Sequence, residues 1–111
     1  MSPPAQDPRT AYVHEVLHLY VRTPGVLGRL RHADRQLAGQ LFDQGVPLYA
    51  VQNALILAAA RRIRHNAFSA PLPPVRSLHY FISTIREVLD RPPGYREIED
   101  LRHTISTYWP R

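Results

Sequence analysis

Cysteine is absent from the 111 residues of the chain, and so is lysine. Without cysteine the protein cannot form a disulfide bond or offer a thiolate to a metal ion. This composition suits a reducing compartment, and we expect a cytoplasmic protein.

Long apolar segments are also missing. The longest apolar run is ALILAAA at residues 54–60, which is far too short to cross a bilayer. The N-terminal sequence MSPPAQDPR lacks the apolar stretch of a secretory signal peptide. We therefore expect a soluble protein without a membrane partner.

The positive charge is concentrated in the middle of the chain. Residues 22–64 hold seven arginines against Asp34 and Asp43, a net charge of +5, and the charges of the two flanks cancel. A clustered excess of this kind attracts polyanions, and the planar guanidinium group fits phosphate oxygens. A GC-rich genome accounts for the use of arginine instead of lysine, but it does not account for the clustering.

Proline and glycine divide the sequence into segments with helical periodicity, and none is typical of a strand. Asp7 and Pro8 form a typical helix start, and the turn at residues 23–25 ends this first helix. Gly45 is placed for a left-handed C-cap, and Pro47 for the start of the next helix. The other four expected helices cover residues 29–43, 47–65, 75–90 and 95–108.

The third helical segment is apolar on most sides, which is typical of the buried centre of a bundle. Residues 66–74, with three prolines, are expected to form a loop after it. These patterns predict an all-α fold, a compact orthogonal bundle of about five helices with a central apolar helix. We expect a single domain over residues 1–111, with a flexible N-terminus at residues 1–6.

The stretch HEVLH at residues 14–18 matches the His-Glu-x-x-His motif of zinc peptidases. In such enzymes His14 and His18 would bind zinc from one helix face, and Glu15 would act as general base. No third ligand follows at a known spacing, and no sheet is expected to bind a peptide substrate. We therefore favour half-buried structural histidines over a metal site, and we expect no cofactor.

The sequence pattern of residues 33–55 is typical of a helix-turn-helix, with Gly45 in the turn. In a DNA-binding protein, Gln52 and Asn53 would then contact base edges in the major groove. The helix becomes almost wholly apolar after Asn53, so a plain pair of packed helices is the alternative that we favour.

Two groups of arginines are candidates for phosphate contact. The first is Arg29, Arg31 and Arg35, before and within the second expected helix. The second is Arg61, Arg62 and Arg64, near the end of the third helix, where favourable interaction with the helix dipole is an alternative role.

The segment VRSLHYFISTIREVL at residues 75–89 resembles the motif helix of DnaD-type primosomal domains. Phe81, Ile85 and Leu89 take the positions of bulky residues that recur there at four-residue steps. Residues 44–62 resemble the preceding helix of such domains. The sequence also resembles those of small bacterial helical proteins. The resemblance implies a helical module that binds DNA and partner proteins during replication initiation.

These observations predict a non-enzymatic accessory protein that binds nucleic acid, DNA or RNA, through its central arginine cluster. The alternative is a helical module for protein–protein interaction or self-assembly, in which arginines serve solubility or pair with acidic partners. A small zinc peptidase is the third interpretation.

Overall fold

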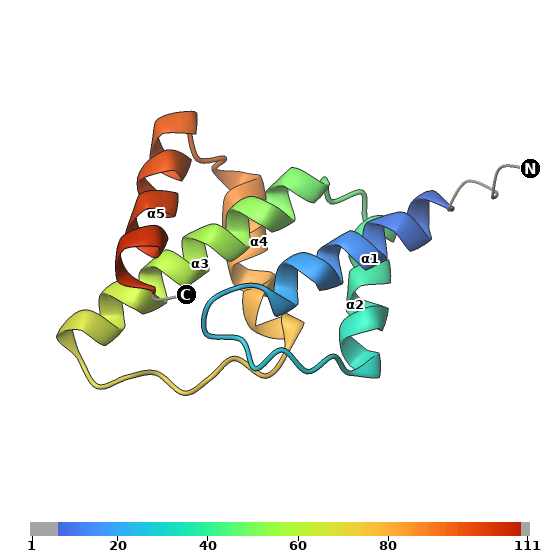
Figure 1. Cartoon of the computed structure of the whole chain (residues 1–111). Helices are drawn as coiled ribbons and strands as arrows, with labels where there is room; N and C mark the ends of the chain where they lie inside the picture. The colour runs from blue at the N-terminus through green and yellow to red at the C-terminus, as the bar shows by residue number, and fades with distance from the viewer. Residues whose placement is uncertain (1–6, 110–111) are drawn as a thin grey trace, which may run out of the picture.

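The computed structural model describes residues 7–109 and contains helices but no strand in this range (Figure 1). The α-helices are α1 (Pro8–Val21), α2 (His32–Asp43), α3 (Leu48–Phe68), α4 (Ile82–Asp90) and α5 (Tyr95–Tyr108), and the 3-10 helix η1 (Leu78–Phe81) leads into α4. The predicted all-α bundle is confirmed. The predicted flexible segment at residues 1–6 lies outside the described residues.

Helix α3 is the centre of the bundle, because it contacts α1, α4, α5 and η1, whereas α2 packs mainly on α1. Figure 1 shows α1 and α3 running alongside each other, with α2, α4 and α5 crossing them steeply. Many buried residues of α3 are alanines, and small side chains at a helix contact let the neighbouring helices approach closely. Within the described part of the chain, no helix has both the length and the apolar composition that a membrane span requires.

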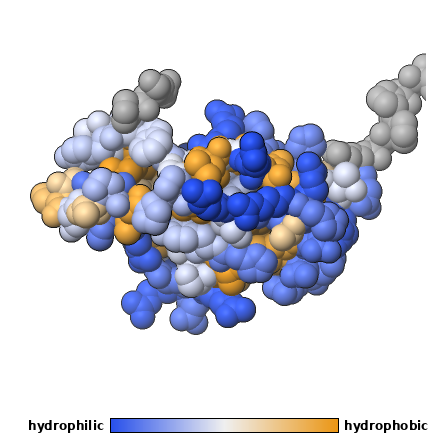
Figure 2. All heavy atoms as spheres, turned by 90° about the horizontal axis from the view of Figure 1, so that it is seen from below, coloured by the Kyte–Doolittle hydropathy of each residue, from blue (hydrophilic) through white to orange (hydrophobic). Residues whose placement is uncertain are grey.

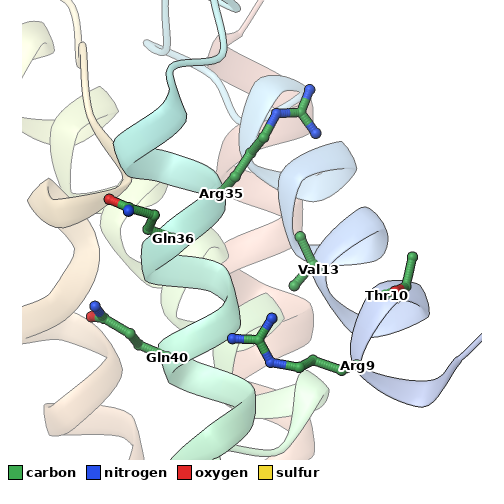
Figure 3. Close-up of a pocket in the computed structure, with 6 residues that line it drawn as sticks. All are labelled: Arg9, Thr10, Val13, Arg35, Gln36 and Gln40. Atoms are coloured by element: carbon green, nitrogen blue, oxygen red, sulfur yellow. The ribbon is translucent and has the colours of Figure 1, made fainter.

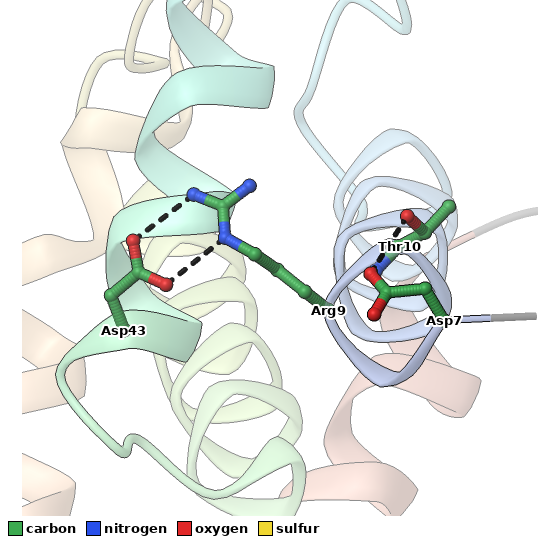
Figure 4. Close-up of polar contacts among 4 residues, drawn as sticks. All are labelled: Asp7, Arg9, Thr10 and Asp43. Carbon is green, nitrogen blue, oxygen red and sulfur yellow. Dashed lines mark hydrogen bonds and ion pairs between the residues drawn. The ribbon is translucent and has the colours of Figure 1, made fainter.

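The helix ends near residues 7 and 45 form as their sequences predict. One carboxylate oxygen of Asp7 accepts hydrogen bonds from the backbone N–H of Thr10 at 3.0 Å and from its hydroxyl at 3.1 Å (Figure 4). This cap satisfies one of the free N–H groups at the start of α1. Gly45 has a φ of +75°, a left-handed conformation that glycine adopts without a steric penalty.

Three predicted boundaries are wrong. Helix α2 begins at His32 because residue 31 is extended, with φ −118° and ψ 159°. Helix α3 continues to Phe68, through the first residues of the expected loop. The fourth expected helix begins only at Leu78, because Val75 pairs with Val26 in an isolated parallel bridge.

Two core tyrosines differ in how their hydroxyl groups are satisfied. The Tyr20 side chain is fully buried and packs edge-on against Phe81, but no group in residues 7–109 forms a hydrogen bond with its hydroxyl. Burial, followed by the negative charge of Asp34, raises the pKa of Tyr20. Burial raises the pKa of Tyr12 to about 12, and its hydroxyl donates a 2.8 Å hydrogen bond to the Val46 carbonyl.

We expect Tyr20→Phe to raise the free energy of unfolding by about 1 kcal/mol, because the substitution removes a buried polar group that has no partner. The matched control Tyr12→Phe should lower it by about 1 kcal/mol, because that substitution leaves the Val46 carbonyl without its donor. Urea denaturation followed by circular dichroism measures both changes. If Tyr20→Phe loses as much stability as Tyr12→Phe, the Tyr20 hydroxyl does have a hydrogen-bond partner and the prediction is wrong.

Candidate nucleic-acid interface

A buried aspartate joins the two long connections of the fold. Asp34 is 0% exposed, and its two carboxylate oxygens accept hydrogen bonds from two backbone N–H groups. One comes from Arg31 at 3.0 Å, next in the chain to α2, and the other from Leu78 at 2.9 Å, at the start of η1. The carboxylate therefore holds the end of the first connection against the end of the second.

The same two connections are joined again at the bridge between Val26 and Val75. The Leu27 N–H donates to the Val75 carbonyl at 3.0 Å, and the Val75 N–H donates to the Gly25 carbonyl at 2.7 Å. Residues 22–31 and 69–77 thus meet at this bridge, in the lower part of Figure 1.

Four exposed arginines lie in these two connections or directly after them in the chain: Arg29, Arg31, Arg35 and Arg76. The backbone of Arg31 is extended, and the half-buried Leu30 separates the exposed Arg29 and Arg31, so we infer that these two arginine side chains leave on the same side. Arg76 follows the buried Val75 and therefore points outward. We call these four residues the arginine face.

The arginine face has no exposed carboxylate near it in sequence. No acidic residue occurs between residues 16 and 33 or between residues 44 and 86, and Asp34 is buried. Figure 2, which views the bundle from this side, shows strongly hydrophilic side chains running across the middle of the face, flanked by apolar ones. Arg29, Arg31 and Arg35 lie close together in the chain, and the Val26–Val75 bridge brings the segment that contains Arg76 to theirs.

A polar groove between α1 and α2 extends from Arg35. Its volume is about 480 Å³, and its lining includes Arg35, Gln36 and Gln40 from α2 and Thr10 from α1 (Figure 3). A second hollow of about 400 Å³ shares Arg35 and continues past His14. Arg35 therefore stands where the arginine face meets this groove.

Arg9 lies at the other end of the groove and forms an ion pair with Asp43. Its Nε and Nη2 atoms each lie 3.0 Å from a carboxylate oxygen of Asp43 (Figure 4). The hydrogen bond from Arg9 lowers the pKa of Asp43. Gly39 makes room for this pair, because a Cβ there would overlap the Arg9 guanidinium.

The second predicted arginine group is not a free cluster. Arg61 donates to both carboxylate oxygens of Glu87 on α4, and this hydrogen bonding lowers the pKa of Glu87. Arg64 is exposed and lies 3.3 Å from the Thr104 hydroxyl on α5. Of this group, Arg64 has the fewest contacts within the described residues.

Arg62 lies in the interior. A cluster of arginines that contacts phosphate would need it on the surface. Only 8% of the residue is exposed. Its guanidinium donates to the Tyr80 hydroxyl at 2.9 Å and to the Pro73 carbonyl at 2.6 Å. Because residues 73–80 fold back over α3, Arg62 binds this connection and is too buried to contact the phosphate backbone of a nucleic acid.

Gln52 and Asn53 are half-buried on α3, whose neighbours include α1 and α5. Gln52 lines a hollow with Leu55 and Ile105, so its side of α3 faces α5 and not open solvent. A helix that reads base edges needs an open face that fits the major groove. The half-buried side of α3 gives Gln52 and Asn53 no such open face. The expected plain pair of packed helices at residues 33–55 is also wrong, because α2 packs on α1 and η1, and α3 packs on α1, α4 and α5.

His14 and His18 lie one turn apart on the exposed side of α1. Within residues 7–109, no group of three His, Asp or Glu side chains is arranged to hold a metal ion. His18 Nε2 lies 3.2 Å from Arg22 Nη1, and a cation so close opposes zinc binding at that nitrogen. The motif therefore provides two ligands, whereas catalytic zinc sites have three protein ligands.

We expect His14→Ala to leave thermal unfolding unchanged, with or without added zinc. An exposed histidine contributes little to stability, and two ligands alone do not hold zinc tightly. Differential scanning fluorimetry with zinc and with EDTA measures this, with His103→Ala on α5 as the matched control. Stabilisation by zinc in the wild type that His14→Ala abolishes would restore the metal site.

Arg76 is not among the residues predicted from the sequence, because it lies outside residues 22–64, where the net positive charge is concentrated. The acid-free stretch from residue 44 to residue 86 is the signal that includes it. No protein-family model, no curated protein and no solved structure matches the chain. The resemblance to DnaD-type domains accordingly stays a prediction.

Proposed function

We propose that the protein is a non-enzymatic accessory protein that binds nucleic acid through phosphate contacts made by Arg29, Arg31, Arg35 and Arg76. The observation that supports this most strongly is the arrangement of the arginine face. Backbone hydrogen bonds hold its two connections together. The nearby acid, Asp34, is buried and links the same two connections through its carboxylate. The proposal includes a cytoplasmic location, where nucleic acid is accessible.

The chemistry of the face fits a phosphate backbone better than base edges. None of its four guanidinium groups is in an ion pair among the described residues, so their fork-shaped donors are free for phosphate oxygens. The half-buried Gln52 and Asn53 do not supply direct base readout. We therefore propose binding with little sequence preference, in which the phosphates supply most of the affinity.

Fluorescence anisotropy with labelled duplex and single-stranded DNA and RNA, over a salt series, tests the proposal. We expect the logarithm of the binding constant to fall linearly with the logarithm of the salt concentration, with a slope of roughly −3 to −4 for duplex DNA if all four arginines contact phosphate. No binding at 20–50 mM salt, about the range where phosphate contacts are strongest, would overturn it.

A helical module for protein docking or self-assembly is the second candidate. It is favoured by Phe68 at the end of α3, which is 89% exposed, and by Tyr95 on α5, which is 80% exposed. Exposed aromatic side chains are common in protein–protein interfaces. Light scattering that shows a defined oligomer, together with no affinity for nucleic acid, would favour this candidate.

A further inference from the structure

Arg62 carries a buried positive charge that no carboxylate in the described residues neutralises. Its two side-chain hydrogen bonds go to neutral oxygens, those of Tyr80 and Pro73. An arginine stays cationic in proteins, and buried charges are normally paired because their desolvation is costly. A guanidinium group has five N–H donors, so donors remain for an additional acceptor.

A cavity of about 290 Å³ lies beside this charge. Arg62 and Asn66 are its polar side chains, and the rest of its lining is apolar or glycine. Asn66 already accepts a 2.9 Å hydrogen bond from the Leu72 N–H, which leaves its amide donors free to face a ligand. An apolar cavity with a few convergent donors is typical of a small-molecule site.

A second cavity of about 350 Å³ adjoins this one, between α3, α5 and the end of α1. The two share Pro24, Ala59 and Trp109 in their linings. The second cavity has apolar walls that include Leu55 and Ile56, with Arg22 and Arg102 among its polar residues. Among residues 7–109, no side chain that lines either cavity is acidic.

We propose that the joined cavities bind a small amphiphile with a carboxylate head and an unbranched apolar chain. The carboxylate accepts hydrogen bonds from Arg62 and neutralises its charge, and the chain lies past Ala59 in the apolar second cavity. Charge complementarity selects this occupant, because every ionised group that the described residues place in the linings is an arginine, and among them only Arg102 is in an ion pair, with Glu99. The site uses none of the four residues of the arginine face, so it stands independently of nucleic-acid binding.

Trp109 is the only tryptophan of the chain and lines both cavities, so its fluorescence reports their occupancy. The probe is decanoate below its micellar concentration, with decanol and decyltrimethylammonium as uncharged and cationic controls. We expect saturable binding of one decanoate, at least about tenfold tighter than decanol, and no saturable binding of the cation. Equal affinity for all three compounds would show nonspecific adsorption and would overturn the proposal.

Two kinds of variant separate the head contact from the chain site. Arg62→Gln should remove the preference for decanoate over decanol, whereas Arg62→Lys, which keeps the charge, should retain most of it. Ala59→Leu places bulk at the junction of the cavities and should weaken both ligands at least tenfold. If Arg62→Gln does not fold, the decanoate-to-decanol ratio in the wild type and the Ala59→Leu result decide the question. Unchanged decanoate affinity in Ala59→Leu would locate binding elsewhere and overturn the proposal.

Discussion

Replacing Asp34 with alanine is expected to lower the free energy of unfolding by about 3 kcal/mol. The substitution leaves the N–H groups of Arg31 and Leu78 without their acceptor, and each buried donor without a partner costs roughly 1–3 kcal/mol. The loss is a large fraction of the stability of a domain of this size, which is typically about 5–15 kcal/mol. Urea denaturation followed by circular dichroism at 222 nm measures it.

The cost arises from geometry as well as from hydrogen-bond number. The Asp34 carboxylate joins α2 to Leu78, 44 positions further along the chain, so its loss also releases the second connection from the start of α2. Asp34→Asn keeps the shape but turns one acceptor into a donor that faces an N–H group. We expect this variant to lose about half as much stability, roughly 1–2 kcal/mol.

Asp43→Ala is the matched control, because it removes an aspartate from the same helix. Its side chain is about half exposed and pairs with Arg9 at the surface, so its loss should be much smaller than that of Asp34. Equal stability losses at the two positions would contradict a special role for Asp34.

The helices were predictable where the sequence itself contains the signal that starts or ends them. Asp7 and Gly45 act through local backbone geometry, so α1 begins and α2 ends as predicted. The α3 helix was predictable as the bundle's centre because a segment apolar on most sides has to be buried.

The start of α2 was not predictable in this way, because it depends on a contact distant in sequence. Asp34 accepts from Leu78 as well as from Arg31, and the backbone before it stays extended beside the Val26–Val75 bridge. Periodicity in residues 29–43 contains no information about that partner segment.

The environments of the arginines at the candidate site also depend on contacts distant in sequence, so the sequence alone does not predict them. The net charge of residues 22–64 correctly indicates where arginine is dense, but it does not distinguish an exposed guanidinium from one that is buried or paired. Arg62 is buried because residues 73–80 return to it, and Arg61 is paired because α4 brings Glu87 to it. Arg76 joins Arg29 and Arg31 through the bridge, although it lies more than 40 positions away in sequence.

The triple variant Arg29→Gln, Arg31→Gln, Arg76→Gln is expected to weaken binding to duplex DNA by roughly a hundredfold or more at about 50 mM salt. Each lost phosphate contact should also make the salt dependence shallower by about 0.9 in the log–log slope, about 2.7 for three contacts. Because all three side chains are exposed and in no ion pair among the described residues, the variant should fold like the wild type. Anisotropy titrations over a salt series measure both effects.

The matched control removes the same charge from another part of the surface. Arg86→Gln, Arg91→Gln, Arg96→Gln replaces three exposed arginines on and between α4 and α5, where Asp90 and Glu97 are close in sequence. If affinity depended on net charge alone, the two triple variants would bind equally weakly. Because phosphate contact requires guanidinium groups that reach the backbone together, we expect the control to keep its affinity within about threefold and its slope within about 0.5 of the wild type. Equal losses in the two variants would show that charge alone attracts the nucleic acid and that the arginine face has no special part in binding it.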